Sequence, residues 1–270
     1  MKPVRFVLAL LALGCSGVAC VRTESAEPAA GDSQAEVRPK AEVVVDPGQK
    51  SAVEALRKLG ARLQMSEEGK VEGIELSNPK LVDDDLAALG GLTTVQSLEI
   101  GGGRVTDAGL AHLRKLTSLE RLYLRHLKVT DAGLKHLRGL TSLESLSLED
   151  AQVNSEGIAH LAPLEGLGVL NLSGNKKVTN EALKHLNRMA DLDTLSLEGT
   201  GVTGAGLVHL KPLTKLRTLN LRYCNVADAD LAHLEGFEEL RMLYLKGTKV
   251  DEDKIDEFKS KMNSLVVFFY

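Results

Sequence analysis

A repeat of 24 residues runs through most of this chain and constrains its fold more than any other feature. The segment from Val129 reads VTDAGLKHLRGLTSL, and the segment from Val105 reads VTDAGLAHLRKLTSL. Seven places of the repeat, numbered 1, 4, 6, 11, 16, 19 and 22, are apolar in all eight copies, although only 43% of the chain is hydrophobic. The copies begin at Val71, Val95, Leu119, Leu143, Leu167, Leu192, Leu216 and Leu240, and the fifth and eighth each carry one extra residue. A period of this length indicates a solenoid, in which each unit buries its apolar side chains against the next unit.

Each repeat divides into one strand and one short helix. Leu119, Leu122 and Leu124 begin a pattern that suits a short strand, whereas the spacing of three between Leu134 and Leu137 suits one face of a helix. Between them lie residues whose side-chain oxygens can accept hydrogen bonds from free N–H groups at a helix N-terminus. These candidate caps are Asp83-Asp84, Thr106-Asp107, Thr130-Asp131, Asn154-Ser155, Thr179-Asn180, Thr203, Asp228 and Asp251.

The pattern resembles the leucine-rich repeat family, specifically its 24-residue variants with helices on the outer face. The resemblance covers Val71 to Tyr270. It implies an α/β solenoid with a parallel β-sheet on the concave face and short helices on the convex face. Eight repeats are therefore assigned to residues 71–264.

The ninth place of the repeat departs from the family, which often has Asn there. Asn175 is the one asparagine at this place among the eight repeats, so we expect no continuous asparagine ladder. Cys224 occupies a ninth place that the family also fills with Cys, and we interpret it as a small buried residue and not as a reactive thiol. The other ninth-place residues are Pro79, Gly103, Leu127, Ala151, Thr200 and Thr248.

The first 20 residues have the composition of an export signal. Lys2 and Arg5 precede an apolar run over residues 6–13, which is too short for a comfortable membrane span. Cys15 and Cys20 each follow a small residue, which resembles the lipobox of bacterial lipoproteins, in which the cysteine is acylated.

The two cysteines leave three alternatives open. The lipoprotein family usually has Leu three places before the cysteine, where this chain has Ala12 or Gly17. Lipidation at Cys15, lipidation at Cys20 and an ordinary cleaved signal peptide all predict a protein exported from the cytoplasm. The lipidated forms are held at the bacterial envelope membrane, and the third is periplasmic or extracellular.

The chain between the signal and the repeats divides into a tether and a cap. Residues 21–47 are rich in Ala, Glu, Pro and Ser, a composition that predicts a disordered tether. Residues 48–70 are expected to cap the N-terminal end of the solenoid, with an amphipathic helix over residues 51–59 and an edge strand over residues 61–65.

The C-terminal end is expected to close with a charged helix over residues 250–262 and a last strand over residues 265–270. Leu265, Phe268 and Tyr270 fall on places 1, 4 and 6 and should point inward. An apolar edge strand can pair with another chain, so Val267 and Phe269 are alternative candidates for a contact with a second copy.

Six of the seven histidines occupy the same place of the repeat: His112, His136, His160, His185, His209 and His233. Neighbouring helices pack about 8–10 Å apart, whereas zinc needs its ligand nitrogens about 2 Å from the ion. We therefore predict no metal site, and we interpret each imidazole as a partly buried group that bonds to an adjacent turn or repeat.

The remaining motifs give no support for catalysis. The stretch from Gly199 to Gly204 matches G-x-G-x-x-G, but its glycines fill turn places of the repeat and the doubly wound topology is absent. Glu149-Asp150 and the aspartates at 83–85 could hold a divalent cation weakly, but solvated turns and helix caps explain them more simply. No nucleophile elbow, zinc-protease motif, Walker loop or paired C-x-x-C occurs. We predict no enzymatic activity and no cofactor.

Side chains at places 3, 5 and 7 must point away from the core, because places 4 and 6 point into it. On this face the large side chains gather in two stations with small or acidic residues between them. Tyr and Arg are frequent in binding hot spots, so this face is the candidate ligand-binding surface; the alternative is a solvated sheet. The N-terminal station is Arg121, Tyr123, Arg125 and His126, followed by Glu149; the C-terminal station is Asn220, Arg222, Tyr223, Tyr244 and Lys246.

We therefore hypothesise an exported scaffold that binds a protein or peptide through its concave face without chemistry. One alternative is an envelope structural or adhesive protein that binds polysaccharide. Another is a ubiquitin-ligase-type effector adaptor, although the segment before Val71 is too short and too polar for the extra domain that this requires. The formal net charge of −4 gives no electrostatic reason to expect a nucleic-acid partner.

Overall fold

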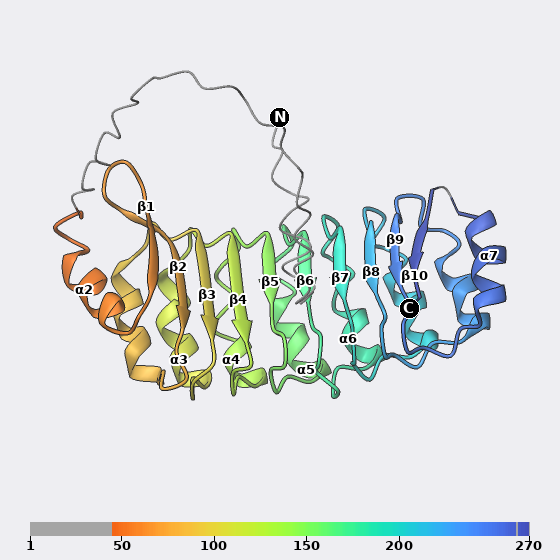
Figure 1. The fold of residues 1–270 in the computed structure, drawn as a ribbon, viewed down its shortest axis with the longest axis horizontal. Coiled ribbons are helices and arrows are strands. Elements are labelled where there is room, and N and C mark those ends of the chain that lie inside the picture. The colour runs from red at the N-terminus through yellow and green to blue at the C-terminus, as the bar shows by residue number, and fades with distance from the viewer. Residues whose placement is uncertain (1–44, 263, 270) are drawn as a thin grey trace, which may run out of the picture.

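The computed structural model describes residues 45–262 and 264–269. The predicted signal segment, Cys15, Cys20 and almost all of the predicted tether lie outside the described residues, as do Asn263 and Tyr270. The described chain forms one ten-stranded sheet whose strands follow the order of the sequence. Short helices lie along one face of this sheet (Figure 1). The first strand pairs antiparallel with the second, and all later neighbours are parallel, which confirms the predicted solenoid.

Each repeat supplies a strand followed by a short α-helix, a 3₁₀ helix or both. The strands are β1 (Arg62–Met65), β2 (Val71–Ser77), β3 (Ser97–Gly101), β4 (Arg121–Arg125), β5 (Ser145–Ser147), β6 (Val169–Asn171), β7 (Thr194–Ser196), β8 (Thr218–Asn220), β9 (Met242–Tyr244) and β10 (Val266–Phe268). The α-helices are α2 (Lys50–Lys58), α3 (Asp107–Leu110), α4 (Asp131–Leu134), α5 (Ser155–Ile158), α6 (Asn180–Lys184) and α7 (Glu252–Ser260). The 3₁₀ helices are η1 (Asp83–Gly91), η2 (Ala111–Lys115), η3 (Ala159–Leu161), η4 (Gly204–Leu210) and η5 (Asp228–Leu234).

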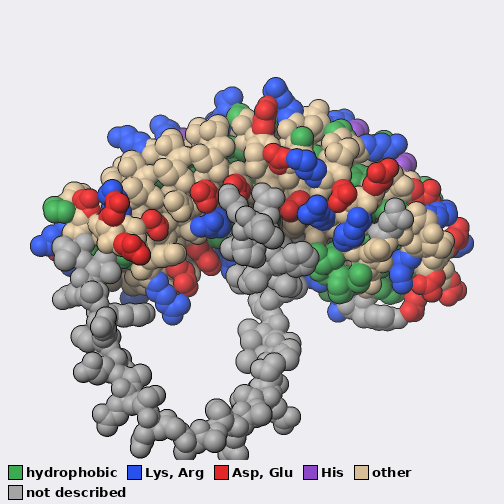
Figure 2. All heavy atoms as spheres, turned by 90° about the horizontal axis from the view of Figure 1, so that it is seen from above, with side chains coloured by type: hydrophobic (Ala, Val, Ile, Leu, Met, Phe, Trp, Pro, Cys, Tyr) green, Lys and Arg blue, Asp and Glu red, His purple; other side chains and the backbone are tan. Residues whose placement is uncertain are grey.

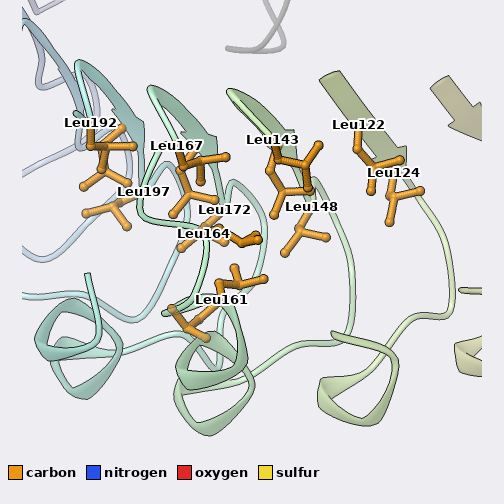
Figure 3. Packing of buried hydrophobic residues seen from close by; sticks show 14 of the residues in the cluster. Leu122, Leu124, Leu143, Leu148, Leu161, Leu164, Leu167, Leu172, Leu192 and Leu197 are labelled. Carbon is orange, nitrogen blue, oxygen red and sulfur yellow. The ribbon is translucent and has the colours of Figure 1, made fainter. Parts of the chain in front are cut away.

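The repeated apolar places form one continuous core between the sheet and the helices. All of them are buried except Met262, which is partly buried at the C-terminal end. Figure 3 shows leucines of successive repeats lying side by side between the strands and the helices. The fourth-place leucines are paired in direct register from strand to strand: Leu122, Leu146, Leu170, Leu195 and Leu219. Because each leucine packs on its counterparts in the two neighbouring repeats, one repeat cannot bury its core without the others.

A row of side chains, mostly aspartates, joins most of the strand-to-helix turns to the next repeat. Asp83 accepts hydrogen bonds from Thr106 N–H at 2.7 Å, from the Thr106 hydroxyl at 2.7 Å and from Gly109 N–H at 3.0 Å. Asp107 accepts the same two bonds from Thr130, at 2.7 and 2.6 Å. The backbone contact recurs at Asp131–Asn154, Asn180–Thr203 and Asp228–Asp251. These side chains therefore stabilise the helix start of the following repeat.

The predicted caps are thus only partly correct. Thr106 and Asn154 do accept hydrogen bonds from their own helices, at 3.4 and 2.7 Å, but Thr179, Thr203 and Asp251 make no such bond. At these three positions a side chain of the preceding repeat, from Ser155, Asn180 or Asp228, instead accepts a hydrogen bond from the backbone N–H of the predicted cap residue.

Several different donors replace the missing asparagine ladder. Asn175 donates to the carbonyl oxygens of Leu148 and Leu172, at 2.7 and 2.9 Å. Cys224 donates from its thiol to Leu197 O at 3.0 Å. Cys224 is 3% exposed, and burial raises the pKa of its thiol, which confirms the interpretation as a buried residue.

The predicted register of the last strand is wrong by one residue. Strand β10 pairs Val266 with Met242, Val267 with Leu243 and Phe268 with Tyr244. Phe268 therefore lies beside Tyr244 on the face away from the core, where it is 41% exposed. Leu265 is buried as predicted. In the preceding repeat one residue lies between Leu240 and β9, whereas Leu265 directly precedes β10, so the inward and outward positions along β10 shift by one residue. Val267 and Phe269, the candidates for a contact with a second copy, are partly buried against the core.

Candidate ligand-binding surface

The inner face of the solenoid carries both predicted stations. Figure 2 shows the molecule bent into an arc, and Figures 1 and 2 together place the strands on its inner side. Because side chains alternate along a strand, the residues beside the buried leucines face this concave side. Arg121, Tyr123 and Arg125 lie on β4, and Tyr244 lies on β9. Asn220 is the last residue of β8.

The N-terminal station is closely tied to its own neighbours. Arg125 lies 3.4 Å from Glu99 and 4.0 Å from Glu149, so it has a carboxylate on each side. Arg121 pairs with Glu120 at 3.3 Å. Tyr123 is only 6% exposed. The positive charges of Arg121 and Arg125 at the N-terminal station are therefore largely balanced by carboxylates of the same surface.

At the C-terminal station three side chains form a stack: Arg222 just beyond β8, Tyr244 on β9 and Phe268 on β10. The Arg222 guanidinium lies 4.5 Å from the centroid of the Tyr244 ring. Tyr244 in turn stacks on Phe268, with the ring centroids 4.4 Å apart and the planes at 10°. Cation–π and aromatic contacts of this kind contribute about 0.5–1.5 kcal/mol each. The stack holds its side chains in fixed positions before any ligand binds.

Asn220 supports this station but does not present a free polar group. It is fully buried. Its side-chain nitrogen donates to Glu198 at 2.9 Å, and its side-chain oxygen accepts from Arg222 N–H at 3.1 Å. Glu198 also lies 3.5 Å from the Arg222 guanidinium. We therefore correct its predicted role from ligand contact to positioning residue.

The polar residues between the stations are also engaged with one another. Ser173 donates from its backbone and from its hydroxyl to the side-chain oxygen of Asn171, at 2.9 and 2.5 Å, and its hydroxyl lies 2.8 Å from that of Ser196. All three residues are buried. The small residues predicted between the stations are present, and the hydrogen-bonding groups of Asn171, Ser173 and Ser196 are used internally.

His126 and Tyr223 occupy the left-handed backbone region in the turns that follow β4 and β8. Their φ angles are 54° and 57°, and Asp150 has 50° at the equivalent place. This conformation costs a non-glycine residue about 1–2 kcal/mol. His126 pairs with Asp150 at 3.1 Å, whereas the Tyr223 ring lies over Gly247, where an added Cβ would overlap it. Tyr223 is 57% exposed, so the strained backbone presents a large ring at the rim of the concave face.

The histidine row lies on the helical side and is partly buried at every position, as predicted. Arg114 Nε donates to His136 Nδ1 at 2.9 Å. Partial burial and the neighbouring Arg114 charge lower the pKa of His136 below its ordinary value of 6.5. Within residues 45–262 and 264–269, no three His, Cys, Asp or Glu side chains are grouped closely enough to hold a metal ion. Nor does this part of the chain contain a helix with the length and apolarity needed to span a bilayer.

Sequence reasoning missed three residues of the concave surface. Phe268 and Val266 were assigned to the wrong phase, and Glu99 was not recognised as the partner of Arg125. Glu99 occupies the same place of its repeat as Tyr123 does in the next one, and the two residues are paired between β3 and β4. This shared place was a signal that could have identified Glu99 as a residue of the concave face.

Comparison with known proteins agrees with this geometry. The Leucine Rich repeat family model matches residues 213–233. No curated protein sequence matches the chain. Internalin C2 of Listeria monocytogenes strain 4b F2365 is similar in structure, with a TM-score of 0.62 and 22% identity over 83% of this chain and 93% of that chain. The plant peptide hormone receptor RGFR1, solved in complex with RGF2, gives a TM-score of 0.53 and 17% identity over 77% of this chain and 36% of the receptor chain. At these identities the likeness concerns the fold.

Proposed function

We propose that this chain, a leucine-rich repeat protein, is a non-catalytic scaffold that binds a protein or peptide through the concave face of its sheet. The observation that carries the proposal is the C-terminal station, where the side chains of Arg222, Tyr244 and Phe268 are stacked and Tyr223 and Phe268 are substantially exposed. Aromatic and arginine side chains held rigidly in this way lose little conformational entropy on binding. The solved complex of RGFR1 with RGF2 supports the proposal by analogy of fold.

Ligand specificity in this proposal resides in side chains that the scaffold displays, and no reaction, cofactor or metal is involved. The concave residues contact one another through ion pairs, hydrogen bonds and ring contacts. Arg125 forms an ion pair with Glu99, for example, and Arg222 forms a cation–π contact with Tyr244. These arrangements stabilise a surface of fixed shape. A fixed surface suits recognition of a partner by shape and charge.

We further propose that the protein acts outside the cytoplasm, as a bacterial envelope protein held by a lipid or released after signal cleavage. The support is the sequence of residues 1–20, with its basic start, short apolar run and cysteines. Labelling cells with a palmitate analogue and comparing Cys15→Ser with Cys20→Ser identifies the anchor. Loss of label in one variant supports lipidation at that cysteine, whereas undiminished label in both variants and in the double variant contradicts lipidation at either.

Site-specific photo-crosslinking tests binding by the concave face. A photoreactive amino acid is placed at exposed Lys246 or at Arg121, and in a control protein at Val208, a 38% exposed residue of the helical face. Irradiation with an envelope extract should give a discrete protein adduct from the concave positions and none from position 208. Adducts from position 208 alone, or the same adducts from all three positions, would contradict the proposal. A carbohydrate adduct would instead favour the polysaccharide alternative.

A further inference from the structure

Exposed apolar side chains gather at the C-terminal end of the concave face. Among the described residues, four large hydrophobic side chains are exposed: Val208, Tyr223, Val266 and Phe268. Val208 lies on the helical face, but the other three lie on β10 or at the rim beside β9. Figure 2 shows hydrophobic side chains gathered on the inner side of this end of the arc. We call the exposed residues Tyr223, Val266 and Phe268, together with the buried Tyr244 on which Phe268 stacks, the C-terminal patch. An exposed apolar patch on an otherwise polar surface indicates an interaction site.

The outer edge of β10 offers main-chain groups beside this patch. Val266 N–H donates to Arg241 O, and Phe268 O accepts from Leu245 N–H, so both residues direct these groups toward β9. Backbone groups of consecutive residues in a strand point to opposite edges, so those of Val267 point outward. Strand β10 is the last strand of the described sheet. An extended segment can therefore add to this edge.

The other end of the sheet is protected against strand addition. Edge strand β1 carries Arg62, whose side chain is 83% exposed, and its register with β2 is broken between Gln64 and Met65. Charges and bulges of this kind discourage pairing with a further strand. Strand β10 has neither feature, because its residues are Val266, Val267 and Phe268 and its pairing with β9 is regular.

The charge around the patch favours an acidic partner. Lys246 is exposed on the concave face two residues beyond Tyr244, and no carboxylate among the described residues forms an ion pair with it. Arg222 has Glu198 as its carboxylate partner, so Lys246 is the cation beside the patch whose charge is not balanced by an ion pair within the described residues. At the N-terminal station, in contrast, Arg125 has two carboxylate partners. An acidic ligand is therefore attracted to the C-terminal end and not to the N-terminal station.

A second copy of the chain fits this edge less well than a peptide. Two β10 strands of three residues each would bury far less than the roughly 1,200 Å² of a stable interface. An extended peptide can pair with β10 and also lay its side chains on the patch. One of these side chains would lie about 4.8 Å from Phe268, the spacing of neighbouring strands. An aromatic side chain at that point would extend the stack of Arg222, Tyr244 and Phe268.

We propose that the C-terminal patch binds an extended acidic peptide as an additional strand beside β10, with an aromatic side chain of the peptide against Phe268 and a carboxylate near Lys246. This inference rests on the proposed function and names the ligand class and the part of the concave face that it occupies. Main-chain hydrogen bonds supply affinity, and the aromatic and acidic side chains supply specificity.

A tryptophan-containing peptide tests the inference directly, because the protein has no tryptophan. The probe is the capped heptapeptide acetyl-SDVWVDS-amide, in which tryptophan and both aspartates share one face of a strand. Its emission should shift to shorter wavelength and saturate when the full chain is added. The charge-reversed peptide acetyl-SKVWVKS-amide, and a version methylated at alternate backbone nitrogens, should bind at least about tenfold more weakly, a difference of about 1.4 kcal/mol.

Variants of the protein locate the site. Lys246→Glu and Phe268→Ala should each weaken binding of the acidic peptide by about tenfold or more, whereas Val208→Ala should leave it unchanged. Lys246 is exposed, so its substitution tests the site even if Phe268→Ala disturbs β10. Unchanged affinity in both variants, or equal affinity for the acidic and basic peptides, would overturn the inference. If the acidic peptide does not bind while position 246 still crosslinks a protein partner, the ligand class is wrong but the proposed function stands. If crosslinking from the concave positions also fails, the proposed function fails as well.

Discussion

Replacing Asp83 by alanine tests whether the aspartate row joins the repeats. The Asp83 carboxylate accepts three hydrogen bonds from the next repeat, two from Thr106 and one from Gly109. Hydrogen bonds to a charged group contribute about 1.5–3 kcal/mol each, but bonds within one cluster are not additive and the site is only partly buried. Water can also replace some of the lost contacts. We therefore expect Asp83→Ala to lower the free energy of unfolding by about 2–4 kcal/mol.

The neighbouring Asp84 provides a matched control. Asp84 is exposed, and like Asp83 it lies in the first turn of η1. Both carboxylates interact with the helix dipole, a contribution of about 0.3–1 kcal/mol, so Asp84→Ala measures that contribution alone. Asp83→Asn keeps an acceptor oxygen but loses the charge, and it should fall between the two alanine variants.

Urea unfolding followed by circular dichroism gives the free energies, and an unchanged m-value shows that the variants unfold the same surface. Amide hydrogen exchange adds a local measurement, because only Asp83→Ala should speed exchange at Thr106 and Gly109. Equal unfolding free energies for Asp83→Ala and Asp84→Ala would refute the reasoning. Unchanged exchange at the two amides would refute it independently.

Three further predictions concern single positions of the solenoid. A Cβ at Gly133 would overlap the aspartate of the preceding repeat, so Gly133→Ala should lower the free energy of unfolding by about 1–3 kcal/mol and with it the melting temperature. Gly139 has open space around it, so Gly139→Ala should leave the melting temperature unchanged. The pKa of His136, followed by NMR, should lie below 6.5 and rise in Arg114→Ala. As the pH falls, the His136 imidazole is therefore protonated in the unfolded chain before it is protonated in the folded protein. The contribution of His136 to stability is complete above pH 6.5 and is lost as the pH falls through the unfolded and then the folded pKa. His136→Gln should reduce this acid dependence, and an unchanged acid dependence in that variant would count against the prediction. Iodoacetamide should alkylate Cys224, identified by peptide mapping, far more slowly in the folded than in the unfolded protein, and similar rates would disprove its burial.

The contrast between the two stations shows how far the concave face could be predicted. Alternation along the strands correctly places Arg121, Tyr123 and Tyr244 away from the core, because the buried leucines fix the opposite face. The pattern does not reveal which of these side chains are neutralised. Glu99 and Arg125 come from different strands, and only the lateral alignment of β3 with β4 brings them together.

The sequence by itself determined the solenoid and its alternation of strand and helix. It could do so because burial of identical apolar places requires identical units to stack, and this requirement repeats every 24 residues. Even the buried character of Cys224 follows from its place in that pattern.

The tertiary structure alone decided which side chains act across repeats. Asp83 contacts residues 23 and 26 positions away, and Asn220 turns inward to hold Glu198 and Arg222. The phase of β10 also depended on the tertiary structure, because Leu265 directly precedes this strand, whereas one residue separates the first place from the strand in the preceding repeat. Periodicity fixes the face on which a side chain lies, but its partner depends on how neighbouring repeats align, and that alignment exists only in the folded stack.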